Sequence, residues 1–243
     1  DLMTFRTSGI KTHDDKNLVS FSKDILKYKL ENLNYVFDNS KIVKYSYRPF
    51  DNQYIYYDTK ILGRTREKTI RHLKHENLGL ILVAQPQAAN LAYFDCIYIT
   101  NCFTDTNMFR RGGPSVFPLY LYSETSSQTT FEEAPNRVPN HNMEIVSKIE
   151  QQLKLAFVPE ENLVVDLAEG YNGTFAPIDL LDYIYTVLHS PKYRETYKEF
   201  LKIYFPRVSF TKEQKQFWDL VALGKQIREI HLLESDKVND FIS

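Results

Sequence analysis

Two periods of hydrophobic and polar positions follow one another along the first part of the chain. Phe21–Leu30 carries apolar residues at helical spacing and predicts a helix. Residues 42–47 and 53–57 are instead rich in aromatic and β-branched side chains, which suit a half-buried pleated surface. Because Pro49 interrupts this run, we predict two strands joined by a hairpin around residues 48–52.

The middle of the chain predicts a sheet with a helix inserted in it. Residues 66–74 have the pattern of a short helix, and three apolar runs predict buried strands at residues 78–84, 96–100 and 117–122. Residues 123–142 are polar, contain two prolines and lack an apolar period, so we expect a loop or linker there.

The last part of the chain has helical periodicity. Met143–Leu153 is amphipathic, and we expect the region from Pro177 to the end to be wholly helical. Ser190 stands before a proline and predicts a helix N-cap, while Thr211–Gln214 has the spacing of a capping box. Gly224 predicts a close contact between two helices. The whole pattern predicts an α+β fold, a mixed β-sheet module followed by a C-terminal helical subdomain.

Length and composition are those of a globular protein that can bury a core, with 243 residues of which 43% are hydrophobic. We find neither a run of roughly 18 apolar residues nor a secretory leader, so we expect a cytoplasmic protein without a membrane segment. Cys96 and Cys102 are too few for a disulfide framework and are expected to be free thiols. Since the chain starts at Asp1, we interpret it as a fragment of a longer polypeptide.

Residues 60–75, called the basic segment below, carry a net charge of +5 in a chain whose total is -1. Its cations are Lys60, Arg64, Arg66, Lys68, Arg71 and Lys74. A compact cationic patch is typical of a surface that meets phosphate, although a solvated helix face gives the same pattern. A second pair of cations, Arg110 and Arg111, precedes two glycines and favours the phosphate interpretation.

Catalytic motifs are missing from the sequence. It has neither a GxGxxG nor a GxxxxGK[ST] pattern, and it lacks the Asn/Asp-Pro-Pro-Tyr/Phe motif of amino-methyltransferases. Cys102 has no histidine partner near it in sequence, which leaves nucleophilic catalysis unsupported. The carboxylates at 14 and 15, and those at 51 and 58, could form acid/base pairs, but such spacings are more typical of solvated turns.

His72 and His75 are three residues apart on the predicted helix and could in principle share a metal ion. No third ligand stands nearby in sequence, so a polar helix face is the favoured interpretation. We therefore predict no catalytic and no metal-binding residue in this chain.

Several strings resemble one known family, the C-terminal specificity region of single-chain Type ISP restriction-modification enzymes. They occur in the order YRPFDNQYIYYD, GRTREKTIRHL, NLGLILVAQPQ, ITNCFTDTN, FPLYLY and DLLDYIYTVLHSPKYRETYKEFLKIYFPRVSF. The resemblance covers residues 5–234, and its most specific part is Asp182–Arg207. GIKTHDD at residues 9–15 resembles the segment by which such enzymes leave their methyltransferase domain.

The resemblance implies a target recognition domain that binds a short asymmetric site in double-stranded DNA. Its parent polypeptide would join a nuclease, an ATP-driven translocase and an adenine-N6 methyltransferase. S-adenosylmethionine, ATP and Mg²⁺ would serve those upstream domains, and this fragment would need no cofactor. The implied division is a connector at residues 1–32, a recognition module at 33–122, a linker at 123–142 and a helical subdomain at 143–243.

The resemblance also suggests how the contacts with DNA divide. Strings that recur among relatives with different targets are expected to hold the DNA backbone, through Arg64, Arg66, Lys68 and Arg71. Less patterned segments are expected to read bases, because glutamine and asparagine pair with adenine and arginine with guanine. The candidates there are Gln85, Gln87, Asn90, Asn107, Arg110 and Arg111. Arg48 and Asp51 are expected to form a structural ion pair at the hairpin.

The sequence is also compatible with two other interpretations. The chain could be a helical protein-interaction module without direct DNA contact, whose basic segment is only solvated. It could also be a stand-alone enzyme, which the missing motifs argue against. Binding to DNA that weakens with salt distinguishes the recognition domain from the interaction module.

Overall fold

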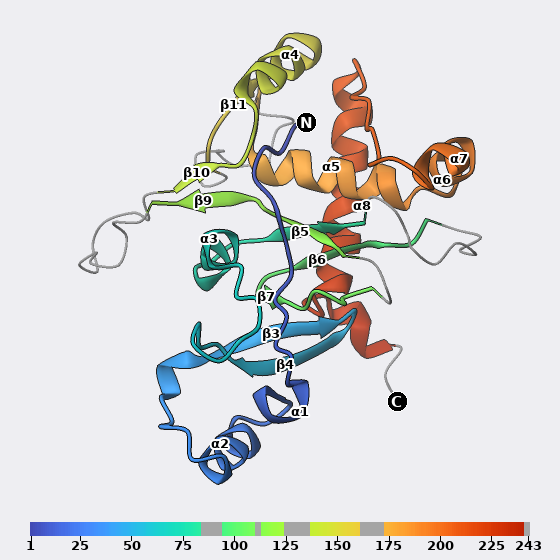
Figure 1. The fold of residues 1–243 in the computed structure, drawn as a ribbon. Helices are drawn as coiled ribbons and strands as arrows, with labels where there is room; N and C mark the ends of the chain where they lie inside the picture. Colours follow the sequence, from blue (N-terminus) through green and yellow to red (C-terminus); the bar gives the residue numbers. More distant parts are fainter. Residues whose placement is uncertain (84–93, 110–112, 124–136, 161–172, 241–243) are drawn as a thin grey trace.

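The computed structural model describes residues 1–243 except 84–93, 110–112, 124–136, 161–172 and 241–243 (Figure 1). The strands are β1 Thr7–Ser8, β2 Val19–Ser20, β3 Ile42–Arg48, β4 Asp51–Tyr56, β5 Gly79–Leu82, β6 Ile97–Thr100, β7 Phe103–Thr104, β8 Ser115–Pro118, β9 Tyr120–Tyr122, β10 Arg137–Pro139, β11 Ala156–Phe157 and β12 Thr174–Phe175. The helices are α1 Asp15–Leu18, α2 Lys23–Asn32, α3 Glu67–Ile70, α4 Met143–Leu153, α5 Pro177–His189, α6 Pro191–Thr196, α7 Lys198–Leu201 and α8 Gln214–His231, with 3₁₀ turns η1 Asn39–Lys41, η2 Arg71–Lys74 and η6 Asp236–Asp240.

The first sheet has four strands in the order β1-β8-β5-β6, and each neighbouring pair is antiparallel. Every residue of the inner strand β5 is buried, as its continuous apolar sequence predicts for a strand covered on both faces. The expected strands at 78–84 and 96–100 are confirmed by β5 and β6. The run at 117–122 is divided between β8 and β9, which belong to different sheets because the chain changes direction at Leu119.

The second sheet has the order β2-β4-β3-β7, and its β3–β4 hairpin confirms the prediction for residues 42–57. The expected ion pair between Arg48 and Asp51 is wrong. Arg48 Nη1 lies 3.0 Å from Oδ1 of Asp105, which is only 2% exposed. A buried carboxylate needs a hydrogen-bonded partner, whereas Asp51 is near solvent and accepts bonds from Gln53.

The N-terminal residues contribute to both sheets. β1 pairs with β8 of the first sheet, and β2 pairs with β4 of the second. Between them, a Cβ atom on Gly9 would lie 2.4 Å from the backbone carbonyl of Asp105, so only glycine fits this close approach. Residues 1–32 are therefore part of the folded sheets as well as a candidate connector, and the boundary at residue 32 stays a prediction.

The linker expected at 123–142 includes a structured part. β10 pairs with β9, with Val138 opposite Leu121. Asn140 is fully buried, and its side-chain amide donates hydrogen bonds of 2.8 Å to the carbonyl groups of Phe5 and Pro118. The loop prediction is therefore wrong for residues 137–139, which form β10, while residues 140–142 are a loop whose buried Asn140 is satisfied by backbone partners. Residues 124–136 lie outside the described part of the chain.

Helices α5 and α8 cover one side of the first sheet, and they lie across one another in Figure 1. One face of α5 packs on the sheet through Leu181, Tyr185 and Leu188, and another packs against α4 and α8 through Leu180 and Tyr183. The helices predicted at 21–30 and 143–153 are confirmed by α2 and α4. These observations confirm the α+β class.

Close contact between α5 and α8 depends on a glycine, as predicted. A Cβ atom on Gly224 would lie 1.9 Å from the carbonyl oxygen of Asp182. The same part of the interface contains a bidentate ion pair, in which Arg228 donates to both carboxylate oxygens of Asp182 at 2.7 and 3.0 Å. Close packing at Gly224 and the ion pair of Arg228 with Asp182 therefore hold the two helices together in the same part of their interface.

The sequence predicted that the region after Pro177 is wholly helical, and this prediction is wrong. Residues 202–213 lie outside the helices because Pro206 restricts its neighbour and lacks an N–H. Side chains hold this segment: Tyr183 donates to the carbonyl of Ser209, and Gln152 donates to that of Phe210. The Ser190 cap is confirmed, since its Oγ accepts from the N–H of Tyr193 at 3.4 Å.

The predicted capping box at Thr211–Gln214 is wrong in register. Helix α8 begins at Gln214 with Glu213 as its N-cap, and Thr211 Oγ1 accepts a hydrogen bond of 3.2 Å from the N–H of Glu213. Thr211 Oγ1 also donates to the side chain of Gln216 rather than bonding the expected glutamine. The threonine therefore shapes the approach to the helix instead of capping it.

Candidate nucleic-acid interface

The backbone of the basic segment is held by contacts at Arg64 and Thr65. Lys11 and Arg64 form a two-way bridge, in which each N–H donates to the other's carbonyl at 3.0 and 2.9 Å. Tyr57 then donates its hydroxyl to the carbonyl of Thr65 at 3.1 Å. Arg66 follows in the left-handed conformation with φ of 54° and starts α3. The cationic side chains therefore project from a fixed backbone.

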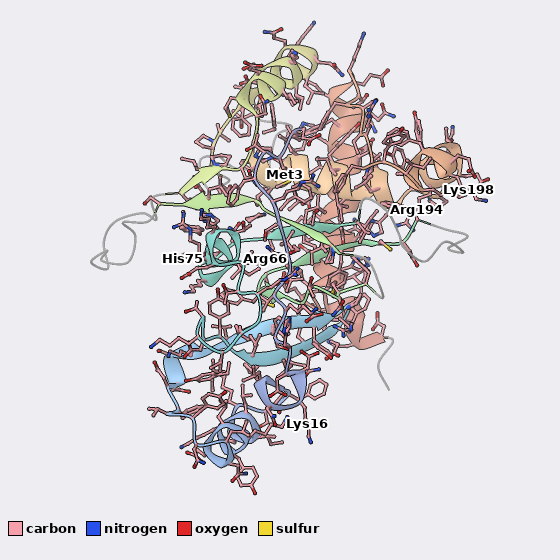
Figure 2. The ribbon with its side chains drawn as sticks, in the orientation of Figure 1. Met3, Lys16, Arg66, His75, Arg194 and Lys198 are labelled. Carbon is pink, nitrogen blue, oxygen red and sulfur yellow. The ribbon has the colours of Figure 1, made fainter. Side chains whose placement is uncertain are left out.

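Three of the four cations assigned to the DNA backbone lie together at the surface. Arg64, Arg66 and Lys68 are exposed and line an open groove of about 680 Å³. Arg71 is half-buried and lies outside the residues that line it. Figure 2 shows Arg66 beside α3, far from the labelled Arg194 and Lys198 on the other side of the molecule. The groove therefore presents these three positive charges to solvent, together with the carboxylate of Glu67.

His72 corrects the interpretation of this segment as a polar helix face. Its side chain is buried, and Nδ1 accepts a hydrogen bond of 2.9 Å from the N–H of Tyr122. Burial lowers the pKa of His72 to about 4, assisted by the nearby charge of Arg71. His75 stacks on the ring of Tyr122 with centroids 4.5 Å apart. The two histidines therefore anchor the end of the basic segment to β9, His72 by a hydrogen bond and His75 by stacking.

Metal and acid/base chemistry find no support in the part of the chain that the structure describes. No group of three or more His, Cys, Asp or Glu side chains gathers there to hold a metal ion. Asp15 accepts from the Tyr47 hydroxyl at 2.9 Å, and Asp58 pairs with Lys41 at 2.6 Å, so both carboxylates have structural partners. Cys96 and Cys102 are buried free thiols, and burial raises the pKa of Cys96 to about 12.

The candidate base-reading residues lie mostly outside the described part of the chain. This holds for Gln85, Gln87, Asn90, Arg110 and Arg111. Asn107 is described and exposed, and its backbone N–H donates to Oδ1 of Asp105 at 2.6 Å. Its side-chain amide is left facing solvent on a backbone that the Asp105 carboxylate holds.

The candidate base-reading residues fall in two segments, 85–92 and 104–115, and one described flank of each lies at the same end of the first sheet. Leu82, the last residue of β5, is opposite both Ile97 and Ser115. The first candidate segment follows Leu82 in sequence, and the second starts at the end of β7 of the second sheet and ends at Ser115. The register therefore places the start of one segment beside the end of the other, which the sequence alone does not show.

The sequence analysis did not predict one exposed cation of the groove, Arg6. Arg6 precedes β1 and lines the same groove as the three cations of the basic segment. It stands alone in sequence, without other basic residues beside it, so charge clustering could not find it. Only the pairing of β1 with β8 brings it to this surface.

Comparison with known families identifies the chain. The family model described as the Type ISP C-terminal specificity domain matches residues 4–243. The chain belongs to this family. This match confirms the resemblance that the sequence strings indicated, over almost the full length of the specificity domain. No curated protein matches it.

Solved structures share the fold of this specificity domain. It is similar to the ATP-dependent Type ISP restriction-modification enzyme LlaBIII bound to DNA, with a TM-score of 0.70 at 18% identity over 96% of this chain and 16% of the other. A DrdV–DNA complex matches with a TM-score of 0.71 at 18% identity over 96% and 23%. A nuclease-deletion mutant of the Type ISP enzyme LlaGI with a DNA substrate mimic gives 0.62 at 20% identity over 96% and 22%.

The specificity domain therefore corresponds to less than a quarter of each of these larger chains. Among the helices that the structure describes, none is long and apolar enough to cross a membrane.

Proposed function

We propose that this specificity domain binds double-stranded DNA and selects the target site for the other domains of a Type ISP restriction-modification enzyme. The observation that carries the proposal is the family match over residues 4–243, joined to a fold shared with enzymes solved in complex with DNA. The exposed cations of the basic segment support it, because each cation brought to a phosphate releases a condensed counterion.

The contacts divide into two kinds in this proposal. Arg64, Arg66 and Lys68 hold phosphates from the groove, and Arg71 supports them from its half-buried position. Asn107 and the candidates at 85, 87, 90, 110 and 111 read base edges, since amides pair with adenine and guanidinium groups with guanine. Backbone contacts set affinity, and base contacts set preference.

The longer polypeptide would carry out the chemistry outside this chain. It would use S-adenosylmethionine to methylate adenine at N6, and ATP with Mg²⁺ for translocation before cleavage. The specificity domain would present the site to the methyltransferase, which must take the target adenine out of the base stack to reach it. Its partners are therefore the duplex and the methyltransferase and translocase domains. A cytoplasmic location stays a prediction.

A salt titration tests the proposal. We expect the chain to bind a duplex of mixed sequence with an affinity that falls steeply between about 50 and 200 mM salt. Arg64→Gln and Lys68→Gln should each reduce the slope of log affinity against log salt by about 0.9, the contribution of one phosphate contact. Fluorescence anisotropy with a labelled duplex measures both quantities.

Lys198→Gln is the matched control, because Lys198 is also exposed but lies on α7, far from Arg66 in Figure 2. It should leave the slope unchanged. An affinity that does not respond to salt would contradict DNA binding and favour the helical protein-interaction module. Equal losses in all three variants would contradict the assignment of the groove.

A further inference from the structure

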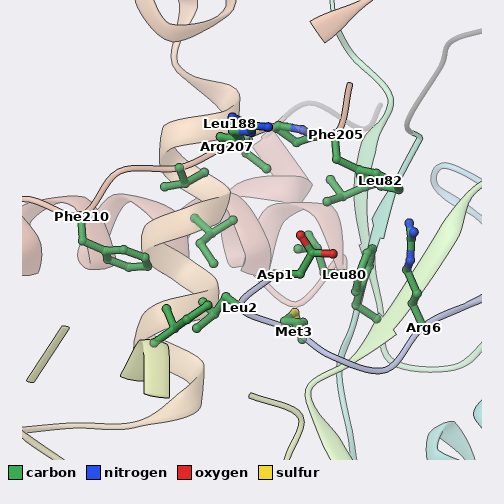
Figure 3. Close-up of a pocket in the computed structure, with 15 residues that line it drawn as sticks. Asp1, Leu2, Met3, Arg6, Leu80, Leu82, Leu188, Phe205, Arg207 and Phe210 are labelled. Atoms are coloured by element: carbon green, nitrogen blue, oxygen red, sulfur yellow. The ribbon is translucent and has the colours of Figure 1, made fainter. Parts of the chain in front are cut away.

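Arg6 is an exposed arginine whose guanidinium group is held in place. Its Nη1 donates a hydrogen bond of 3.2 Å to Oγ of Ser115. The guanidinium carbon lies 4.3 Å from the ring centroid of Phe205 and 5.7 Å from that of Phe117. Figure 3 shows the Arg6 side chain extending along the strands on the side of Leu82 and Phe205. A guanidinium on aromatic faces gains cation–π attraction, so its orientation is set before any ligand arrives.

The held guanidinium keeps most of its donors. Arginine has five N–H donors in a planar fork, and within the described residues one hydrogen bond, to Ser115, uses them. None of the ion pairs among those residues includes Arg6, so its charge is not neutralised there. Such a group matches the paired oxygens of a phosphate, which accept two parallel N–H bonds.

The location of Arg6 joins the two parts of the candidate interface. Arg6 lies between two hollows: it lines the groove together with Arg64, Arg66 and Lys68, and it lines the pocket of Figure 3 together with its aromatic partners Phe117 and Phe205. Its hydrogen-bond partner Ser115 is the first residue of β8 and ends the segment that holds the arginine candidates for base reading. A duplex backbone that lay along the three cations would therefore have Arg6 within the same groove.

We propose that Arg6 is a further DNA-contacting residue, which binds a backbone phosphate between the basic segment and the base-reading segments. The inference rests on the proposed function and adds a contact to it. Phe205 and Phe117 orient Arg6 for this contact, and Ser115 ties its position to the strand that follows the reading segment. The competing role is a brace that only links β8 to residues 202–213.

Two variants separate the contact from the brace. Arg6→Gln should lower the slope of log affinity against log salt by about 0.9, as expected for one lost phosphate contact. Arg6→Lys keeps the charge while losing the planar stack, and it should restore most of that slope. A brace would give the opposite pattern: a lower melting temperature in both variants with an unchanged slope.

A measurement on the unsubstituted chain covers the case in which Arg6→Gln does not fold. Phenylglyoxal modifies accessible arginines, and mass spectrometry of peptides reports the extent at Arg6 with and without duplex. We expect DNA to protect Arg6 and Arg64 together. Protection of Arg64 without Arg6 would overturn this inference and leave the proposed function standing, whereas salt-independent binding or none would overturn the proposed function itself.

Discussion

At the scale of single residues, burial decides what the charged and titratable side chains of the basic segment do. Arg64, Arg66 and Lys68 are exposed in the groove, while His72 is buried and accepts the N–H of Tyr122. The sequence places all four in one cationic run and cannot separate them. The neutral imidazole is the form that can accept this bond, so proton binding to His72 opposes folding.

The pH dependence of stability follows from this histidine. The ordinary pKa of histidine is 6.5, and burial lowers that of His72 to about 4. The unfolded chain therefore binds the proton first, so the contribution of His72 to stability is full above pH 6.5 and is lost as pH falls toward 4. We expect the free energy of unfolding in urea to decrease between these values.

His72→Gln isolates that contribution. The glutamine carbonyl can accept the N–H of Tyr122 without titrating, so the variant should lose less stability on acidification than the parent chain. Some pH dependence should remain, because burial also lowers the pKa values of His141 and His189 to about 4. The same loss in both proteins would rule out His72 as a source of the acid sensitivity.

At the scale of elements, local patterns predicted most helices and strands, but pairing between distant segments decided the rest. Ser190 caps its helix as expected, because a cap depends on neighbours in sequence. The capping box predicted at Thr211 was wrong, because local spacing does not determine the conformation of residues 202–213. Tyr183 and Gln152, which lie far away in sequence, hold this segment through hydrogen bonds. The N-terminal strand β1 likewise depends on a partner about a hundred residues away, beyond the reach of periodicity.

Gly224 is the position where the helix contact can be tested. In an isolated helix, alanine is more stable than glycine by up to about 1 kcal/mol. Here the Cβ would meet the Asp182 carbonyl at 1.9 Å, so Gly224→Ala must separate α5 from α8. We expect a destabilisation of about 1–3 kcal/mol in urea unfolding, the usual cost of overpacking.

Gly113→Ala is the matched control for this substitution. A Cβ atom on Gly113 would find nothing within 4 Å, so the same chemical change should leave stability nearly unchanged. A Gly224→Ala variant as stable as the parent, or more stable, would show that the two helices can move apart at no cost.

At the scale of the whole molecule, the sequence strings identified the family and the α+β class, and both are confirmed by the comparisons and the fold. The candidate site was predictable only in part. Clustered charge pointed to Arg64, Arg66 and Lys68, whereas Arg6 required the topology that places β1 beside β8. The register that places Leu82 opposite Ser115, at one described flank of each candidate reading segment, is likewise a long-range feature that no local pattern encodes.

In the proposed function, the basic segment holds the duplex while residues of the two candidate reading segments choose the sequence. Selection of bound duplexes from a random library, followed by sequencing, measures preference directly. We predict one enriched motif for the parent chain, the same motif at lower yield for Arg64→Gln, and a motif altered at one or two positions for Arg110→Gln. An altered motif for Arg64→Gln, or no enriched motif for the parent chain, would contradict this proposal.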